Sequence, residues 1–282
     1  MSTVTLPLDA ALPRAGLAAA VRSELRKFFT TRMWWGMAIG VFLAGGLFAL
    51  LFALLAGSTA GGGAGSSALP DLSDPQMVST VYTGGLSVGY LLTLAVGVLT
   101  IGSEYRHKTI SSTFLSTPHR ARVMGAKVIS LLVIGAFYGL VSLTGSFGVG
   151  ATVIAIKGFS PAPDGGQLVR TMGLSLLVLG LWALIGLGVG ILIPNQIVAI
   201  LVAVGAAWIV EPLAGLALSF VSWGAKVVPY LPSQATSAMV EQVSQSDTVR
   251  LLSWWGGALV LTGYAAVMAV VGTWLTLRRD VT

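Results

Sequence analysis

The sequence contains no cysteine, which excludes disulfide bonds, thiolate metal sites and cysteine nucleophiles. Charged residues are also scarce: they make up 9% of the 282 residues, whereas 55% are hydrophobic. A soluble domain of this length needs more polar surface than these residues supply. The composition and the long uncharged runs therefore predict an all-α polytopic membrane protein.

Sequence patterns of catalytic sites are missing as well. The chain has no HExxH sequence and no Walker sequence. The glycine-rich run at 61–67 lacks the Gly-Lys-Ser/Thr ending of a phosphate-binding loop and indicates a flexible loop. The two histidines, His107 and His119, have no paired carboxylates nearby, which disfavours a metal or acid–base site. We expect no catalytic residue, no metal and no cofactor in this chain.

The segment before the first membrane span has two parts. Residues 1–14 lack periodicity and the pattern of a cleavable signal peptide, and they indicate a disordered tail. Residues 15–33 place apolar side chains at helical spacing, with Arg22 and Arg26 together on another face. This pattern predicts an amphipathic helix at the inner membrane surface. A plain cytosolic extension of the first span is the alternative.

Six apolar runs are long enough to cross a bilayer. Trp34 and Trp35 open the first run, as expected of aromatic residues at a membrane boundary. The uncharged stretch at 171–210 is too long for one span, and its turn-like break at 194–196 divides it into two. The predicted membrane domain occupies residues 34–282, with spans at 34–56, 82–101, 119–156, 171–193, 197–218 and 251–277.

Glycines recur four residues apart in four of the predicted spans or at their edges. This small-xxx-small pattern predicts close helix packing, within a bundle or between two copies of the chain. The pairs are Gly36/Gly40, Gly85/Gly89, Gly135/Gly139 and Gly186/Gly190.

The positions of the basic residues predict the topology. Twelve of the 16 Lys and Arg residues fall before span one, between spans two and three, or after span six. The positive-inside rule then places both termini and the central connection in the cytoplasm. Because the basic residues lie at the ends of apolar runs, topology explains the net charge of +6, and we expect no nucleic-acid partner. The Ala-, Gly- and Val-rich composition is compatible with a high-GC bacterium, whose inner (plasma) membrane is the predicted location.

The stretch at 211–250 follows span five and is apolar at first. Its prolines, Pro229 and Pro232, lie close to Tyr230, so it cannot be one uninterrupted span. We expect re-entrant or interfacial helices that return to the outer surface; an ordinary apolar external loop is the alternative. Glu211 is the acidic residue expected at membrane depth, where a carboxylate is costly. It would line a substrate pathway or contact a cationic substrate, or else cap these helices beside Pro212.

The connection between spans two and three, at 102–127, is the most charged stretch of the interior sequence. Thr117 and Pro118 form a helix-start signal for span three, and Thr109 can cap a short helix before it. That short helix, 110–115, carries an apolar tip, as expected of a segment that docks a soluble partner. A basic loop that only anchors to lipid is the alternative.

The motifs of this connection resemble those of a known family. EYRHKT, then the short apolar helix, then STPHRARVMGAK resemble the cytosolic loop of the ATP-binding-cassette (ABC) type 2 permeases. SELRKFFTTRMWW at 23–35 resembles that family's interface helix, and PYLPSQATSAM at 229–239 is similar to its external segment before the last span. The resemblance extends over nearly the whole chain, although the glycine-rich loop after span one has no counterpart.

The resemblance implies a transmembrane permease subunit of an exporter. Such a subunit dimerises, with an identical copy or a close paralogue, and docks two separate ATPase subunits that bind ATP and Mg. The cargo would be hydrophobic or amphipathic: a drug, an antibiotic, a peptide or a lipid. The residues that the resemblance assigns to ATPase docking are Glu24, Lys27, Arg32, Glu104, Tyr105, Arg106, Thr109, Ile110, Phe114 and Leu115.

Two mutations follow from this assignment. Phe114→Asp and Glu104→Ala are each expected to abolish transport-coupled ATPase activity while leaving membrane insertion intact. Two other functions stay open at this point. An ion-coupled secondary carrier would need several intramembrane ionisable residues and inverted repeats, and a membrane scaffold without transport would leave the docking-like connection without a purpose.

Overall fold

The computed structural model describes residues 16–58, 69–106, 120–221, 223–244 and 250–278, and within these ranges the regular secondary structure is entirely helical. Six helical segments are long and apolar enough to cross a membrane. This confirms the all-α class and the number of candidate spans. The segments are Met33–Leu55, Leu86–Arg106, Ala121–Ile156, Gly165–Leu192, Gln196–Ser219 and Trp254–Leu275.

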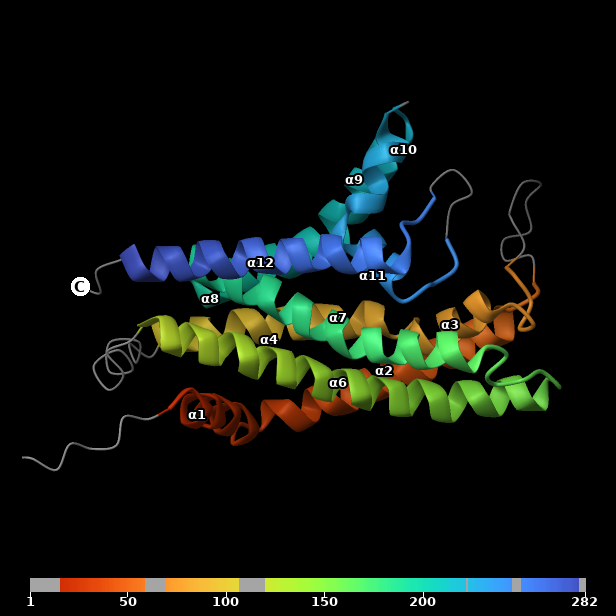
Figure 1. Ribbon diagram of the computed structural model, residues 1–282, viewed down its shortest axis with the longest axis horizontal. Coiled ribbons are helices and arrows are strands. Elements are labelled where there is room, and N and C mark those ends of the chain that lie inside the picture. The colour runs from red at the N-terminus through yellow and green to blue at the C-terminus, as the bar shows by residue number, and fades with distance from the viewer. Residues whose placement is uncertain (1–15, 59–68, 107–119, 222, 245–249, 279–282) are drawn as a thin grey trace, which may run out of the picture.

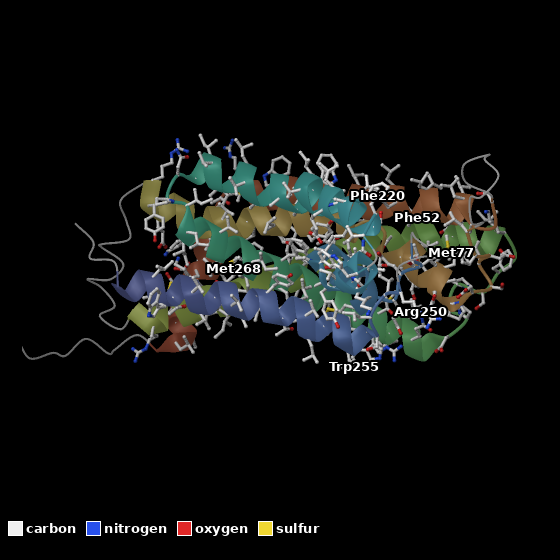
Figure 2. The ribbon with its side chains drawn as sticks, turned by 90° about the horizontal axis from the view of Figure 1, so that it is seen from above. Phe52, Met77, Phe220, Arg250, Trp255 and Met268 are labelled. Atoms are coloured by element: carbon white, nitrogen blue, oxygen red, sulfur yellow. The ribbon has the colours of Figure 1, made fainter. Side chains whose placement is uncertain are left out.

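The long helices lie side by side in an elongated bundle (Figure 1). They are α2 (Met33–Leu55), α4 (Leu86–Arg106), α6 (Arg120–Ile156), α7 (Gly165–Leu192), α8 (Gln196–Gly205) and α12 (Trp254–Arg278). Helix α7 is central: 72% of its apolar stretch is buried, against 17% for α12. It packs against α4, α6 and α12, whereas the outer helices present apolar side chains such as Phe220 and Trp255 on the surface (Figure 2).

Local signals explain where several helices begin. The side chain of Asp74 caps α3 (Pro75–Thr83), and that of Asp164 caps α7. Asn195, in the predicted turn at 194–196, caps α8 by accepting the N–H groups of Ile197 and Val198. The second span was predicted from residue 82, but Tyr82 belongs to α3. Helix α4 begins only after two glycines, at Leu86.

Three of the four glycine pairs serve packing inside this chain. A side chain on Gly135 would meet the backbone of Gly180 in α7, and one on Gly186 would meet the carbonyl of Leu94 in α4. Gly85 lies in the same way against the backbone of α2. Gly36, by contrast, has open space where a Cβ would stand. The small residues thus let α4, α6 and α7 approach closely.

The fifth span changes direction at its middle. Helix α8 is followed by a π-turn, η1 (Ala206–Val210), and then by α9 (Glu211–Ser219). Pro212 accounts for the π-turn, because proline has no N–H to donate and its ring clashes with the carbonyl four residues earlier. Helices α9 and α10 (Gly224–Val227) then project from the bundle as an arm, residues 211–227 (Figure 1).

Two short helices return the chain from the arm to the bundle. They are the 3-10 turn η2 (Val228–Tyr230) and α11 (Pro232–Met239), and α11 packs against α12. The region between the fifth and sixth spans is therefore largely helical from 211 to 239. Its position relative to a membrane belongs to the proposal below.

The predicted amphipathic segment forms a separate helix, α1 (Leu17–Phe29), at one end of the bundle. It packs against α6, with Phe28 buried. The ring of Phe28 meets the ring of Tyr138 edge to face at a centroid distance of 6.1 Å, and the ring of Phe29 meets that of Phe137 at 5.5 Å. Tyr138 also donates a hydrogen bond to the carbonyl of Trp34 at 3.1 Å. These contacts join α1, α2 and α6 at this end.

Candidate functional site

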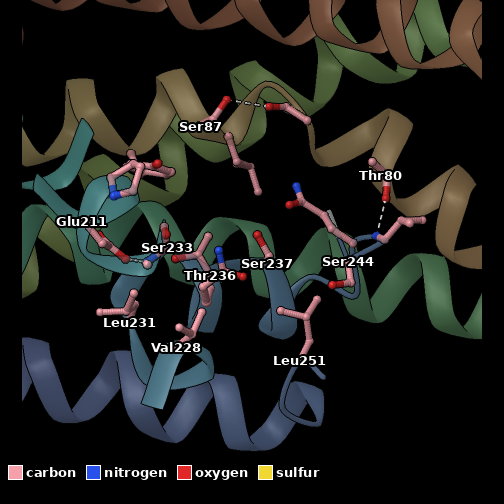
Figure 3. Close-up of a pocket in the computed structure, with 18 of the residues that line it drawn as sticks. Thr80, Ser87, Glu211, Val228, Leu231, Ser233, Thr236, Ser237, Ser244 and Leu251 are labelled. Carbon is pink, nitrogen blue, oxygen red and sulfur yellow. Dashed lines mark hydrogen bonds between the residues drawn. The ribbon is translucent and has the colours of Figure 1, made fainter. Parts of the chain in front are cut away.

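A pocket of about 510 Å³ lies where the arm leaves the bundle (Figure 3). Its walls come from α2, α3, α4, α9, η2, α11 and the segment after α11. Both apolar and hydroxyl side chains line it, and among its described lining residues none is Lys, Arg or His. A cavity of this size that combines apolar walls with a few polar groups is typical of a small-molecule site.

Glu211 supplies a carboxylate to this pocket and is 9% exposed. Its Oε1 accepts the backbone N–H of Ser233 at 2.6 Å, across from α9 to the first turn of α11. None of the ion pairs formed by described residues includes Glu211. The π-turn directly before Glu211 sets its direction, because an extra residue in a helical turn rotates all that follows. The sequence-predicted pathway residue therefore lies in a cavity wall.

A stacked aromatic pair supports the wall behind Glu211. Tyr90 of α4 lies on Trp182 of α7 with their ring centroids 4.4 Å apart, and Tyr90 lines the pocket. Trp182 Nε1 in turn donates to Thr236 Oγ1 of α11 at 2.9 Å. This hydrogen bond ties α11 to the centre of the bundle, so that Ser233 stays in place to donate to the carboxylate.

The segment after α11 closes another side of the pocket. Gln242 Nε2 donates to the carbonyl and the hydroxyl of Thr83, at 3.1 and 3.0 Å, and the N–H of Val243 donates to Thr80 Oγ1 at 2.8 Å. Arg170 of α7 holds the same segment through two hydrogen bonds to the carboxylate of Glu241, at 2.7 and 2.8 Å. These bonds fix the segment across α3 and α7.

A second polar centre lies near the α1 end of the bundle and consists of Glu24, Lys27, Glu104 and Lys127, hereafter the ion-pair network. Lys127 of α6, only 1% exposed, donates to Glu24 Oε2 of α1 at 2.9 Å and to Glu104 Oε1 of α4 at 2.7 Å. Lys27 donates to Glu24 Oε1 at 2.6 Å and to Glu104 Oε1 at 3.1 Å. Two acids and two bases thus link three helices.

Electrostatics favour the charged forms in this network. Burial opposes ionisation of Glu24, but the charge of Lys127 and hydrogen bonds from both lysines outweigh it and lower the pKa of Glu24 below its ordinary 4.5. Burial also opposes the charge on Lys27, yet its hydrogen bond to Glu24 and the charge of Glu104 raise the pKa of Lys27 above 10.5. Both shifts keep Glu24 and Lys27 ionised at neutral pH.

The structure separates the residues predicted to dock an ATPase into three groups. Glu24 and Glu104 are buried and face Lys127, while Lys27 is half-exposed. Tyr105 is partly buried, and the side chains of Arg32 and Arg106 are exposed. The remaining predicted residues lie outside the described residues, as do both histidines. They are Thr109, Ile110, Phe114 and Leu115.

Sequence reasoning missed the part played by Lys127. The sequence pattern only places it inside the third predicted span, at 119–156, whereas the structure makes it the most buried member of the network. One signal could have pointed to it: Lys127 lies seven residues past the start of an apolar helix, where a lone lysine needs a partner. Glu104 likewise lies near the end of an apolar helix, two residues before α4 ends at Arg106.

Comparisons with known proteins add no identity to this geometry. No family model matches the sequence. No curated protein matches it either.

Proposed function

We propose that the chain is the transmembrane permease subunit of an ATP-driven exporter of the ABC type 2 kind, which docks separate ATPase subunits. The observation that carries the proposal is the ion-pair network. Glu24 and Lys27 of the predicted docking residues lie on α1, and Arg32 follows it closely. The network joins α1 to α4 and α6. These are the two helices that flank the docking connection at 107–119. Motion of a docked partner would reach both spans through one rigid unit.

Exposed apolar surface supports a membrane location and a second copy. Along the fifth span and the arm, Leu201, Trp208 and Phe220 are 68%, 67% and 82% exposed. Lipid or another subunit would cover such a face. In this proposal α1 lies in the inner headgroup region, both termini are cytoplasmic, and the arm re-enters the outer leaflet of a bacterial inner membrane.

The proposed mechanism is a rigid-body form of alternating access. A docked ATPase pair would push on the connection between α4 and α6, and the ion-pair network would move α1 together with both helices. Tilting of α4 against the fifth span would change the opening of the pocket, because Tyr90 of α4 and Glu211 of the fifth span both line it. Hydrophobic or amphipathic cargo would leave by this route.

Purification of the protein from its native membrane in mild detergent tests the proposal. We expect a soluble ATPase in about equal amount, and its loss with Phe114→Asp. Ile156→Asp is the matched control, because it also replaces an apolar side chain by aspartate, at the end of α6 far from the docking connection, and should retain the ATPase. Glu104→Ala is a poorer probe of docking, since it would also strip Lys127 of a buried partner.

Recovery of the chain without ATPase activity, from wild-type membranes, would contradict the exporter function. The ion-coupled carrier and the non-transporting scaffold would then be the functions to test. Retention of the ATPase by the Phe114→Asp variant would contradict the docking assignment instead.

A further inference from the structure

The pocket at the base of the arm carries one buried negative group and no described basic group to balance it. Glu211 is 9% exposed, and Ser233, whose backbone N–H donates to its carboxylate, is a neutral partner. An ionised carboxylate in such a place costs free energy unless a cation or further donors compensate it. A positively charged occupant would supply that compensation.

We propose that this pocket binds an organic cation with an apolar body, and that Glu211 is its counter-ion. The inference rests on the proposed function for its biological meaning, since it names the class of cargo. Oε1 of the carboxylate is held by Ser233, and we assign the other oxygen, Oε2, to the cation. A charge-assisted contact of this kind is roughly twice as strong as a neutral hydrogen bond.

The walls of the pocket fit the two halves of such a ligand. Phe52, Leu216 and Leu231 supply apolar surface for its body, while Ser87 and Ser237 supply hydroxyls that accept N–H or O–H groups (Figure 3). The volume of about 510 Å³ lies within the usual range for drug-sized ligands.

The same geometry disfavours other occupants. An anion would bring a like charge next to a carboxylate that is already short of positive partners. A divalent metal would need several acidic or imidazole ligands, and no group of three His, Cys, Asp or Glu that could hold a metal occurs among the described residues. The charge and the apolar walls therefore select the cation together.

Tetraphenylphosphonium and tetraphenylborate test the proposal, because they share one shape and carry opposite charges. Binding is measured by equilibrium dialysis to the full chain in nanodiscs, with empty nanodiscs subtracted. We expect saturable binding of tetraphenylphosphonium, at least tenfold weaker with Glu211→Gln, and no saturable binding of tetraphenylborate, which is dialysed separately because the two ions precipitate together. Asp164→Asn is the matched control: it also removes one carboxylate, outside the pocket lining, and keeps the helix cap.

Three results would overturn the proposal: no saturable binding above that of empty nanodiscs, equal saturable binding of tetraphenylborate in its separate dialysis, or binding by Glu211→Gln within twofold of wild type. Should Glu211→Gln not fold, a thiol placed in the pocket replaces it, because the chain has no cysteine. Tetraphenylphosphonium should slow maleimide labelling of Ser237→Cys at least fivefold and leave Ser160→Cys unaffected. Equal labelling with and without the cation would refute the site.

This assay needs no ATPase, so it fails independently of the proposed function. Glu211-dependent binding in a chain that recovers no ATPase would keep the cation site and refute the exporter. A co-purifying ATPase with no Glu211-dependent binding would keep the exporter and refute the cation as its cargo.

Discussion

Replacement of Lys127 by methionine tests whether the ion-pair network holds the α1 end together. The change keeps the length and most of the volume of the side chain but removes its charge. Lys127 lies 2.9 Å from Glu24 and 2.7 Å from Glu104, and both carboxylate side chains are 8% exposed. Loss of the lysine leaves two buried acids sharing the half-exposed Lys27.

The magnitude follows from the loss of one partner in a buried ionic group. The Coulomb attraction lost with each contact is about 4 kcal/mol at an effective dielectric constant of about 20. Part of that sum is recovered, because methionine does not carry the desolvation penalty of the buried Lys127 ammonium group. We expect Lys127→Met to lower the free energy of unfolding by about 3 to 5 kcal/mol. Adding Glu104→Gln restores the charge balance between Glu24 and Lys27. The double variant should therefore lose about 1 to 3 kcal/mol less than the sum of the two single variants.

Equilibrium unfolding by SDS in mixed micelles, followed by tryptophan fluorescence, measures these differences. Lys157→Met is the matched control, because Lys157 follows α6 at its other end and is exposed. Its ammonium group donates to the backbone carbonyls of Ala53 and Leu54. We expect its cost to stay below about 1 kcal/mol. Equal losses for Lys127→Met and Lys157→Met, or strict additivity in the double variant, would refute the network as a coupled unit.

Three further predictions concern packing, pH and topology. Gly186→Ala should destabilise the bundle by about 1 to 3 kcal/mol or more, since the added Cβ would meet the backbone of α4. Gly173→Ala lies in the same helix with open space around it and should stabilise the bundle slightly. Thermal unfolding in detergent compares the two variants. The lowered pKa of Glu24 means that its stabilisation is present above the ordinary value of 4.5 and is lost as the pH falls through the folded value. Spin labels on α1 and α6 should therefore move apart as the pH is lowered well below 4.5 and not at neutral pH, and an unchanged distance would contradict this. For topology, an impermeant maleimide applied outside whole cells should label Asp164→Cys and spare Arg106→Cys; the reverse pattern would contradict the proposed orientation.

Much of the architecture could be predicted from single residues and short patterns. Asn195 marked the hairpin between the fourth and fifth spans, and the structure uses it as the cap of α8. The π-turn at 206–210 has an equally local cause in Pro212, which follows it closely. These signals are local, because a cap or a missing N–H acts within one turn of the chain.

The placement of side chains between helices could not be predicted in this way. Glu24 and Glu104 look the same in the sequence whether they face a partner protein or Lys127, since Lys127 lies 103 residues from Glu24 and 23 residues from Glu104 along the chain. The pocket beside Glu211 likewise depends on Tyr90, Trp182 and Thr236, which come from three different helices.

The sequence by itself determined that this is an all-helical chain with six segments able to span a membrane, because hydrophobic content and run length act residue by residue. Only the tertiary structure decided which charges neutralise one another and which stays unpaired. Lys127 finds two carboxylates where α1, α4 and α6 meet, whereas Glu211 meets a backbone N–H in a cavity wall. The physical reason is that the free energy of a buried charge depends on its neighbours in space, and helix packing chooses those neighbours.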